Sequence, residues 1–176
     1  PPVEQKPKEE VQIKCKALEI ICLFLIITIF FFRFKISFNE MDVVPYAKAV
    51  FNDNWIPNDW YLNLEIIYRY LFNYTIGFFL ETFGIIPTIV VGRLISYLLI
   101  AMSIHRLLRI INGKSYNAIS YLALVLFFIF FPTGNGAGEW MVGGLETKVF
   151  AYAFSILALA MFLEKRMQLG FLFAGL

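Results

Sequence analysis

The sequence has little charge, one histidine and two cysteines, and each shortage excludes a class of chemistry. Only 16% of its 176 residues are charged, against roughly 25% in an ordinary soluble domain. His105, the single histidine, stands among arginines, so neither a histidine-based zinc site nor a Ser-His-Asp triad can be assembled. Cys15 and Cys22 lie before and within the first apolar run, where one oxidising compartment would not reach both. We interpret them as free thiols.

Other missing features argue against a nucleic-acid partner, a phosphate-binding loop and a cleaved signal peptide. The net charge is only +2 and the basic residues are divided among short loops, so we expect no nucleic-acid partner. The glycine-rich loop TGNGAGEWMVGGLETK lacks the Lys-Ser or Lys-Thr pair of a phosphate-binding P-loop. No small-residue cleavage site follows the apolar run that ends at Phe32, so we interpret this run as a retained membrane anchor and not as a signal peptide.

Apolar residues are in excess, at 60% of the chain against roughly 45–50% in soluble domains. They form long runs, and about 20 mostly apolar helical residues can cross the hydrocarbon core of a bilayer. We therefore predict an all-α fold, a polytopic transmembrane helical bundle with amphipathic extracytoplasmic or interfacial helices. The expected spans are residues 17–36, 85–104, 116–131 and 149–163, with the start of a fifth at 167–176.

Residues 1–16 mix Pro, Lys and Glu with almost nothing to bury, which predicts a cytoplasmic tail. The positive-inside rule places the basic residues just ahead of the first span in the cytoplasm. These residues are Lys6, Lys8, Lys14 and Lys16. Because the chain starts without Met and stops inside an apolar run, we expect a C-terminally truncated piece of a longer protein. Its transmembrane module, 17–176, is expected in a bacterial inner (plasma) membrane.

The stretch between the first two spans is acidic and rich in Asn, Pro and Trp, which predicts an extracytoplasmic loop. Apolar residues recur at helical spacing over 43–52 and indicate a short amphipathic helix. Residues 62–83 are apolar enough to span, but Glu65, Arg69 and Asn73 form a polar stripe at i,i+4 spacing. A charge at the bilayer centre costs about 2.5–3.5 kcal/mol even on the lenient insertion scale. An interfacial helix is therefore favoured over a span.

The basic residues after the second span favour the same choice. With 62–83 at the interface, Arg106, Arg109 and Lys114 fall in the cytoplasm, and nine of the fifteen basic residues then lie inside. If 62–83 crossed the membrane instead, these three residues would lie outside. The positive-inside rule therefore supports the interfacial helix.

Two carboxylates, Glu40 and Asp42, stand where the first span meets its loop. Such a pair could supply a general base, hold a metal ion or bind a sugar hydroxyl, because low-dielectric surroundings can raise the pKa of one carboxyl toward neutrality. The alternative is a solvated loop start in which Asp42 caps the following helix.

Arg93 lies well inside the second span, where a lone cation needs a partner or a wet cavity. A structural role would be a buried ion pair with a loop acid, or snorkelling to the headgroups, and a functional role is about equally favoured. Glu139 and Glu146 add charge in the glycine-rich loop next to the span at 149–163. Ordinary interfacial anchoring is the alternative to a functional role for both.

Four segments follow one another along the chain, and each has a distinct character. They are FNEMDVVPYAKAVF, YRYLFNYTIGFFLETFG, IIPTIVVGRLISYLLI and GGLETKVFAYAF. This order resembles the N-terminal module of the glycosyltransferase C-fold superfamily, membrane enzymes that use polyprenyl-phosphate-linked sugars. In that superfamily an acidic motif follows the first span, membrane-surface helices fill the loop, and an Arg stands near the start of the second span. Met41 separates Glu40 from Asp42, where mannosyltransferases have an adjacent Asp-Glu pair, so which acid would act stays open.

The resemblance implies sugar transfer from a polyprenyl-phosphate donor to an extracytoplasmic acceptor. It implies Asp42 or Glu40 as the catalytic general base, and Arg69 or Arg93 as the cation that neutralises the leaving lipid phosphate. Glu146 would bind the acceptor or a divalent metal ion, and Glu139 is a further candidate for substrate binding.

The segments PNDWYLN and AGEWMVGGLETK also resemble an uncharacterised bacterial family of multispanning proteins, a resemblance that implies no particular activity. The alternative to a transferase is a non-catalytic membrane protein, a transporter or a subunit of an envelope-building complex, in which the acids only shape the loops.

Overall fold

The computed structural model describes residues 6–52, 55–59, 62, 69–112, 121–122, 124, 126 and 142–175. All regular structure in this part of the chain is helical, which confirms the all-α prediction. The helices are α1 (Lys6–Phe31), α2 (Phe38–Ala49), α3 (Tyr70–Phe83), α4 (Ile85–Ile111), α6 (Thr147–Leu163) and α7 (Met167–Ala174).

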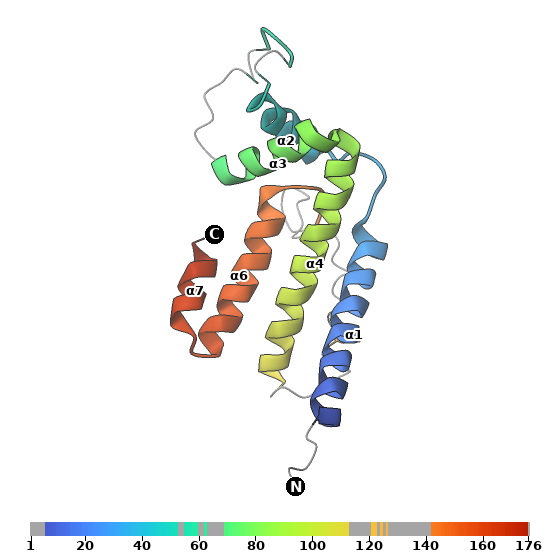
Figure 1. Ribbon diagram of the computed structural model, residues 1–176, viewed down its shortest axis with the longest axis vertical. Coiled ribbons are helices and arrows are strands. Elements are labelled where there is room, and N and C mark those ends of the chain that lie inside the picture. Colours follow the sequence, from blue (N-terminus) through green and yellow to red (C-terminus); the bar gives the residue numbers. More distant parts are fainter. Residues whose placement is uncertain are drawn as a thin grey trace.

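Helices α1, α4 and α6 lie side by side with similar axes, and α7 flanks α6 (Figure 1). Helices α2 and α3 pack on each other across one end of this bundle, and we call the two helices the platform. Helices α1 and α7 run toward the platform, whereas α4 and α6 run away from it. We call the opposite end the basic end, because Arg106 and Arg109 lie near the end of α4 there and Lys165 and Arg166 lie between α6 and α7.

Two buried apolar clusters hold these parts together, and α4 contributes to both. The first joins α1, α4 and α6 along the bundle. Its members are Leu23, Ile27, Tyr97, Ile100, Ala101, Ile104, Val142, Val149 and Ala153. The second fixes the platform to the start of α4. Its members are Val44, Ala47, Ile76, Leu80, Ile89 and Leu145.

Helix α4 is long and apolar enough to cross a membrane. Its 27 residues correspond to about 40 Å at 1.5 Å per residue, more than the roughly 30 Å of a hydrocarbon core. Among the described residues it alone meets this criterion of length and composition, and α6 is a shorter apolar helix.

The exposed face of α4 is apolar, and its buried face carries polar side chains beside the apolar ones of the two clusters. A helix of a water-soluble protein has the opposite distribution. The exposed apolar residues are Ile86, Val91, Ile95, Leu98 and Met102. The buried polar residues are Thr88, Arg93, Ser96, Ser103 and His105. Because Thr88 and Ser103 donate hydrogen bonds to backbone carbonyls, their burial leaves no unmet donor.

Helix α2 begins at Phe38, five residues before the predicted 43–52 helix. Ser37 is its N-cap and forms a capping box with Glu40, in which each side chain accepts a hydrogen bond from the other's backbone N–H. The prediction that Asp42 caps this helix is therefore wrong, and Glu40 belongs to the first helical turn.

Other helix bounds also differ from the predicted ones. Helix α1 already begins at Lys6, within the predicted tail, and Pro7 is tolerated in its first turn, where the missing N–H has no helical partner. Helix α3 begins at Tyr70, directly after Arg69, whose backbone is left-handed (φ 61°). Residues 63–68 of the predicted 62–83 helix, Glu65 among them, lie outside the described residues. Helix α4 continues beyond 104 to Ile111, so Arg106 and Arg109 are helical.

Helix α3 lies across the end of the bundle and not alongside α4 (Figure 1). The chain turns from α3 into α4 at Gly84, whose φ of 84° is readily available only to glycine. This sharp turn separates two helices that the sequence presents as one apolar stretch.

Candidate functional site

Glu40 and Arg93 form a buried ion pair at the platform end of α4. The exposed fractions of the two residues are 0% and 3%. Arg93 Nε donates to Glu40 Oε1 at 2.7 Å, and Arg93 Nη2 donates to Glu40 Oε2. The contact is therefore bidentate, the strongest arrangement of a guanidinium with a carboxylate. The sequence allowed a buried ion pair between Arg93 and a loop acid as one possibility. The structure contains this pair, and it connects α2 to α4.

Two of the three remaining donors of Arg93 are used by the backbone between α1 and α2. Nη1 donates to the carbonyl oxygen of Arg33, and Nη2 donates to that of Lys35 at 2.9 Å. A guanidinium engaged in this way has little capacity left for a ligand phosphate.

Glu40 is held as a carboxylate. Burial by itself raises the pKa of Glu40, but the hydrogen bonds from Arg93, from the Ser37 N–H and from the Leu145 N–H together lower it below its usual value. The Ser37 N–H donates to Oε2 at 2.7 Å and the Leu145 N–H to Oε1 at 2.5 Å. Since both oxygens accept two hydrogen bonds, this carboxylate is a weak base, and the geometry favours a structural role.

The loop 142–146 is seated on this ion pair. A Cβ atom at Gly144 would lie 2.5 Å from Glu40 Cδ and 2.6 Å from Ser37 Oγ, so only glycine fits there. Tyr97, one turn after Arg93, donates its hydroxyl to the Gly143 carbonyl at 2.7 Å. We call Ser37, Glu40, Arg93, Tyr97 and Gly144 the Glu40–Arg93 cluster.

Glu146 lies at the start of α6, next to this cluster, and is 5% exposed. Its Oε2 accepts a hydrogen bond from Asn39 Nδ2 at 3.0 Å and pairs with Lys148 Nζ at 3.0 Å. Helix α2 therefore presents Asn39 and Glu40 to one loop, although that loop is more than 100 residues further along the chain.

The structure does not bring the other predicted site residues into this cluster. Asp42 is exposed, and two residues along a helix turn a side chain by roughly 200°, so Asp42 faces away from Glu40. Arg69 is exposed at the N-cap of α3. Glu139 lies outside the described residues.

The described residues offer no group of donors for a metal ion. Within the described part of the chain, no three His, Cys, Asp or Glu side chains are grouped so that they could hold a metal ion. Glu40 and Glu146, the nearest buried acids, are each engaged by a cation.

Sequence reasoning missed Ser37, Asn39, Tyr97 and Gly144. Ser37-Phe38-Asn39-Glu40 has the S-x-x-E pattern of a capping box, so the start of α2 was recognisable from the sequence. Nothing local indicates that Gly144 touches Glu40, because that contact depends on how α6 and α2 meet at the end of α4.

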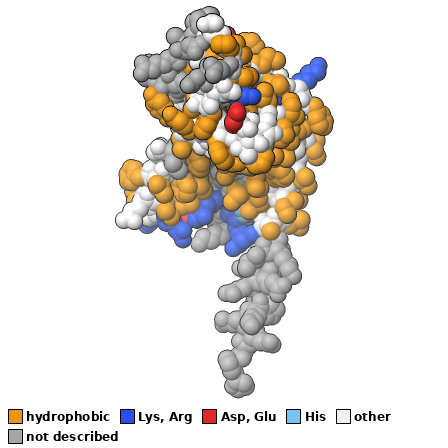
Figure 2. Space-filling model, turned by 45° about the horizontal axis from the view of Figure 1, so that its top comes forward, with side chains coloured by type: hydrophobic (Ala, Val, Ile, Leu, Met, Phe, Trp, Pro, Cys, Tyr) orange, Lys and Arg blue, Asp and Glu red, His pale blue; other side chains and the backbone are white. Residues whose placement is uncertain are grey.

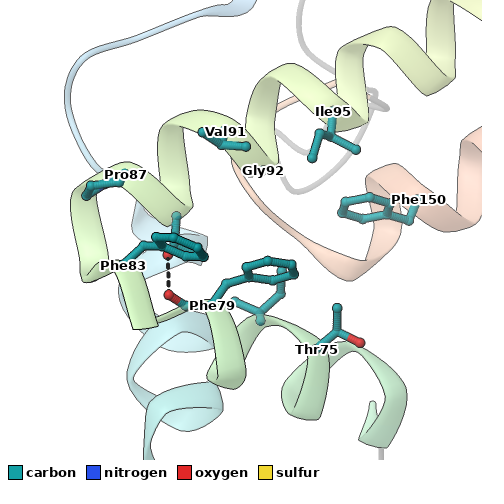
Figure 3. Close-up of a pocket in the computed structure, with 10 residues that line it drawn as sticks. Thr75, Phe79, Phe83, Pro87, Val91, Gly92, Ile95 and Phe150 are labelled. Atoms are coloured by element: carbon teal, nitrogen blue, oxygen red, sulfur yellow. Dashed lines mark hydrogen bonds between the residues drawn. The ribbon is translucent and has the colours of Figure 1, made fainter. Parts of the chain in front are cut away.

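A second feature at the platform end is an apolar groove of about 430 Å³. Figure 3 shows Phe79 and Phe83 of α3 beside Val91 and Ile95 of α4, with Phe150 of α6 on one side. Thr75 and Thr88 also line the groove, and both donate their hydroxyls to backbone carbonyls, Thr75 to that of Leu71 at 2.7 Å and Thr88 to that of Phe79 at 3.0 Å. The groove therefore presents hydrocarbon.

Comparison with protein-family models, with curated proteins and with solved structures gives no match to this chain. In its described part the chain is all-α, with one helix long and apolar enough to cross a membrane. The glycosyltransferase resemblance stays a prediction.

Proposed function

We propose that the chain is a multi-pass integral membrane protein in which α1, α4, α6 and α7 belong to the membrane-embedded bundle. The apolar outer surface of the bundle carries this proposal. Large apolar side chains face outward on all four helices, while the polar residues of α4 face inward. Lipid is the solvent that such a surface requires, because a soluble monomer rarely exposes contiguous apolar patches above a few hundred Å².

In this arrangement the basic end faces the cytoplasm and the platform faces the other side. Lys16, Arg106, Arg109, Lys165 and Arg166 belong to the basic end, and α1 adds Lys6, Lys8 and Lys14. Eight of the fifteen basic residues then lie where the positive-inside rule expects them. Arg33 and Lys35 follow α1 at the platform end, where long side chains can reach the headgroups.

Labelling of single cysteines in intact cells tests this orientation. Phe34→Cys at the platform end and Ile111→Cys at the basic end replace exposed side chains, on a background in which Cys15 and Cys22 are Ser. We expect an impermeant maleimide to label position 34 in intact cells, and position 111 only after permeabilisation. Labelling of both positions in intact cells would contradict the membrane embedding.

We further propose, from the resemblance, transfer of a sugar from a polyprenyl-phosphate donor to an extracytoplasmic hydroxyl. The supporting features are the platform between α1 and α4, its carboxylates, and the apolar groove beside α3, which suits an isoprenoid chain. Asp42 is the better candidate for the general base, because it is exposed whereas Glu40 is bound on both oxygens. Arg69 is exposed, so it is better placed than Arg93 to meet the lipid phosphate.

In the proposed reaction, Asp42 takes the proton of the acceptor hydroxyl as its oxygen attacks the anomeric carbon. The bond from that carbon to the phosphate oxygen breaks, and polyprenyl phosphate leaves with the bonding electron pair. Positioned general bases contribute about 10²–10⁴-fold to a rate. Glu146 would help to position the acceptor, through the polar group that it forms with Asn39 and Lys148.

The test is turnover of undecaprenyl phosphate that carries mannose or aminoarabinose, with purified full-length protein in detergent. Asp42→Asn should lower the rate at least about 100-fold at an unchanged melting temperature. Glu81→Gln, an exposed acid of α3, is the matched control and should retain the rate. Unchanged turnover in Asp42→Asn would remove Asp42 from the mechanism.

A non-catalytic role is the second candidate, and the Glu40–Arg93 cluster favours it. The two most buried charges of the platform end neutralise each other and bind backbone, as structural groups do. The test is again turnover with both donors. If wild-type protein shows the expected cysteine labelling of positions 34 and 111 but turns over neither donor, the non-catalytic role is favoured.

A further inference from the structure

A hollow of about 670 Å³ opens at the basic end of the bundle, far from the platform. Helices α1, α4, α6 and α7 all contribute residues to its lining. Figure 2 shows Lys and Arg side chains gathered over the lower part of the molecule, below a surface that is mainly hydrophobic. Nothing in the proposed transfer reaction uses this region.

The charged wall of the hollow has an excess of cations. Among the described residues that line it, Lys16, Arg106, Arg109 and Arg166 face the single carboxylate of Glu164. That carboxylate is engaged by Arg106 Nη2 at 2.5 Å and lies 3.6 Å from Arg166 Nε. One acid cannot balance four cations, so the wall keeps a positive potential that attracts an anion.

Glu19, just outside the lining, adds a second acid near the hollow. Its Oε2 lies 3.3 Å from Nδ1 of His105, which lines the hollow, and the four cations still outnumber the two carboxylates. Arg106 Nε is buried and has no hydrogen-bond partner in the described part of the chain. An acceptor oxygen of a bound anion would satisfy that donor, whose burial without a partner is otherwise costly.

The rest of the lining is hydrocarbon. Leu99 and Met102 of α4, Leu157 of α6, and Leu169 and Phe173 of α7 form this part. A soluble anion would use only the cationic wall, whereas a phospholipid has a phosphate for that wall and an acyl chain for the apolar part. Basic hollows between membrane helices on the cytoplasmic side are suited to anionic headgroups.

We propose that this hollow binds the phosphate of an anionic phospholipid from the leaflet at the basic end, with an acyl chain against α4, α6 and α7. The proposal rests on the proposed membrane embedding and is independent of the transfer reaction. The cysteine labelling of positions 34 and 111 tests the membrane embedding separately. Failure of the embedding can therefore be distinguished from failure of the lipid-binding proposal.

The experiment measures the Kd of phosphatidylglycerol for the purified full-length protein by native mass spectrometry, with phosphatidylcholine and inorganic phosphate as the other ligands. We expect phosphatidylglycerol to bind at least about tenfold tighter than phosphatidylcholine, and inorganic phosphate not to compete at millimolar concentration. Each cation near an anionic headgroup contributes enough to change affinity about fivefold. Lys16→Gln should therefore weaken binding about fivefold, and Lys16→Gln with Arg109→Gln about 25-fold.

Lys35→Gln is the matched control, an exposed cation at the platform end, and it should leave the Kd unchanged. Lys16 is also exposed, so Lys16→Gln should fold normally even if the double variant does not. Equal affinity for the two lipids, or an unchanged Kd in Lys16→Gln, would overturn the proposal. Full competition by inorganic phosphate would also overturn it, in favour of a soluble anion.

Discussion

Arg93 shows how one residue can determine the arrangement of several segments. Its guanidinium binds Glu40 of α2 and two backbone carbonyls that precede α2, and Glu40 in turn binds the N–H of Leu145. A buried ion pair gains little over a well-packed apolar pair, but removing one partner leaves a costly unpaired charge. The two residues therefore act as one unit.

A double-mutant cycle on this pair should show that coupling. We expect Glu40→Gln and Arg93→Met each to lower the free energy of unfolding by about 3–5 kcal/mol, and the double variant to lose less than the sum of the two. Chemical unfolding in detergent micelles measures these values. Arg106→Gln is the control at the other end, in a pair that is partly exposed, and it should cost about 1 kcal/mol or less. If the double variant lost the full sum of the two single losses in unfolding free energy, Glu40 and Arg93 would not be energetically coupled.

Stability should also depend on pH through Glu40. Its pKa is lowered in the folded protein below the ordinary value of 4.5, so its contribution to stability is fully present above pH 4.5 and is lost as the pH falls through the folded-state pKa. We expect the melting temperature of the wild type to drop on acidification below pH 4.5. Glu40→Gln should have a flatter profile in that range, and an equally steep profile would assign the acid sensitivity to other groups.

At the scale of elements, the loop 142–146 joins α6 to the platform by close backbone approach. Gly144 leaves no room for a Cβ atom beside Glu40 and Ser37, whereas a Cβ atom at Gly143 would meet only Glu146 Oε1 at 3.4 Å, an ordinary contact. Substituting each of these two adjacent glycines by alanine therefore compares a position where a methyl group clashes with the cluster with one where it does not.

Gly144→Ala should lower the free energy of unfolding by about 1–3 kcal/mol, the usual cost of overpacking a closed site. Gly143→Ala should change it by less than about 1 kcal/mol, because its surroundings accept a methyl group. Both values come from the same micelle unfolding measurement. If the two variants cost the same, then backbone conformation and not contact with Glu40 would explain the glycines.

At the scale of the whole molecule, a charge placed on the exposed face of α4 distinguishes a membrane protein from a soluble one. Ile95 lies near the middle of α4 and is 49% exposed. In lipid, Ile95→Lys should cost about 2.5–3.5 kcal/mol of insertion free energy and reduce the membrane-integrated fraction. In water, the same change would be nearly neutral and would improve solubility.

Ile111→Lys is the control for this prediction, because Ile111 is exposed at the last residue of α4, at the basic end. A lysine there can reach the headgroups, so integration should be retained. Carbonate extraction of membranes from expressing cells measures the integrated fraction. Integration of Ile95→Lys at the wild-type level would contradict lipid contact at this face.

The sequence by itself determined the helical class and the positions of its apolar runs, because helix formation and apolar periodicity are local properties. It also determined that Arg93 must have a partner, since a cation inside an apolar helix is costly wherever the chain folds. The start of α2 was equally local, in the S-x-x-E pattern at Ser37, although Asp42 was the predicted cap. The extent of α1 and α4 differed from prediction because helix ends depend on caps and on packing.

Only the tertiary structure decided which acid meets Arg93 and which faces solvent. Glu40 and Asp42 are two residues apart and chemically alike, and the side of α2 that packs on α4 separates their roles. The approach of Gly144 to Glu40 and the hollow at the basic end have the same origin. Both join residues more than 50 positions apart, and such contacts depend on how whole helices pack, which no local pattern in the sequence specifies.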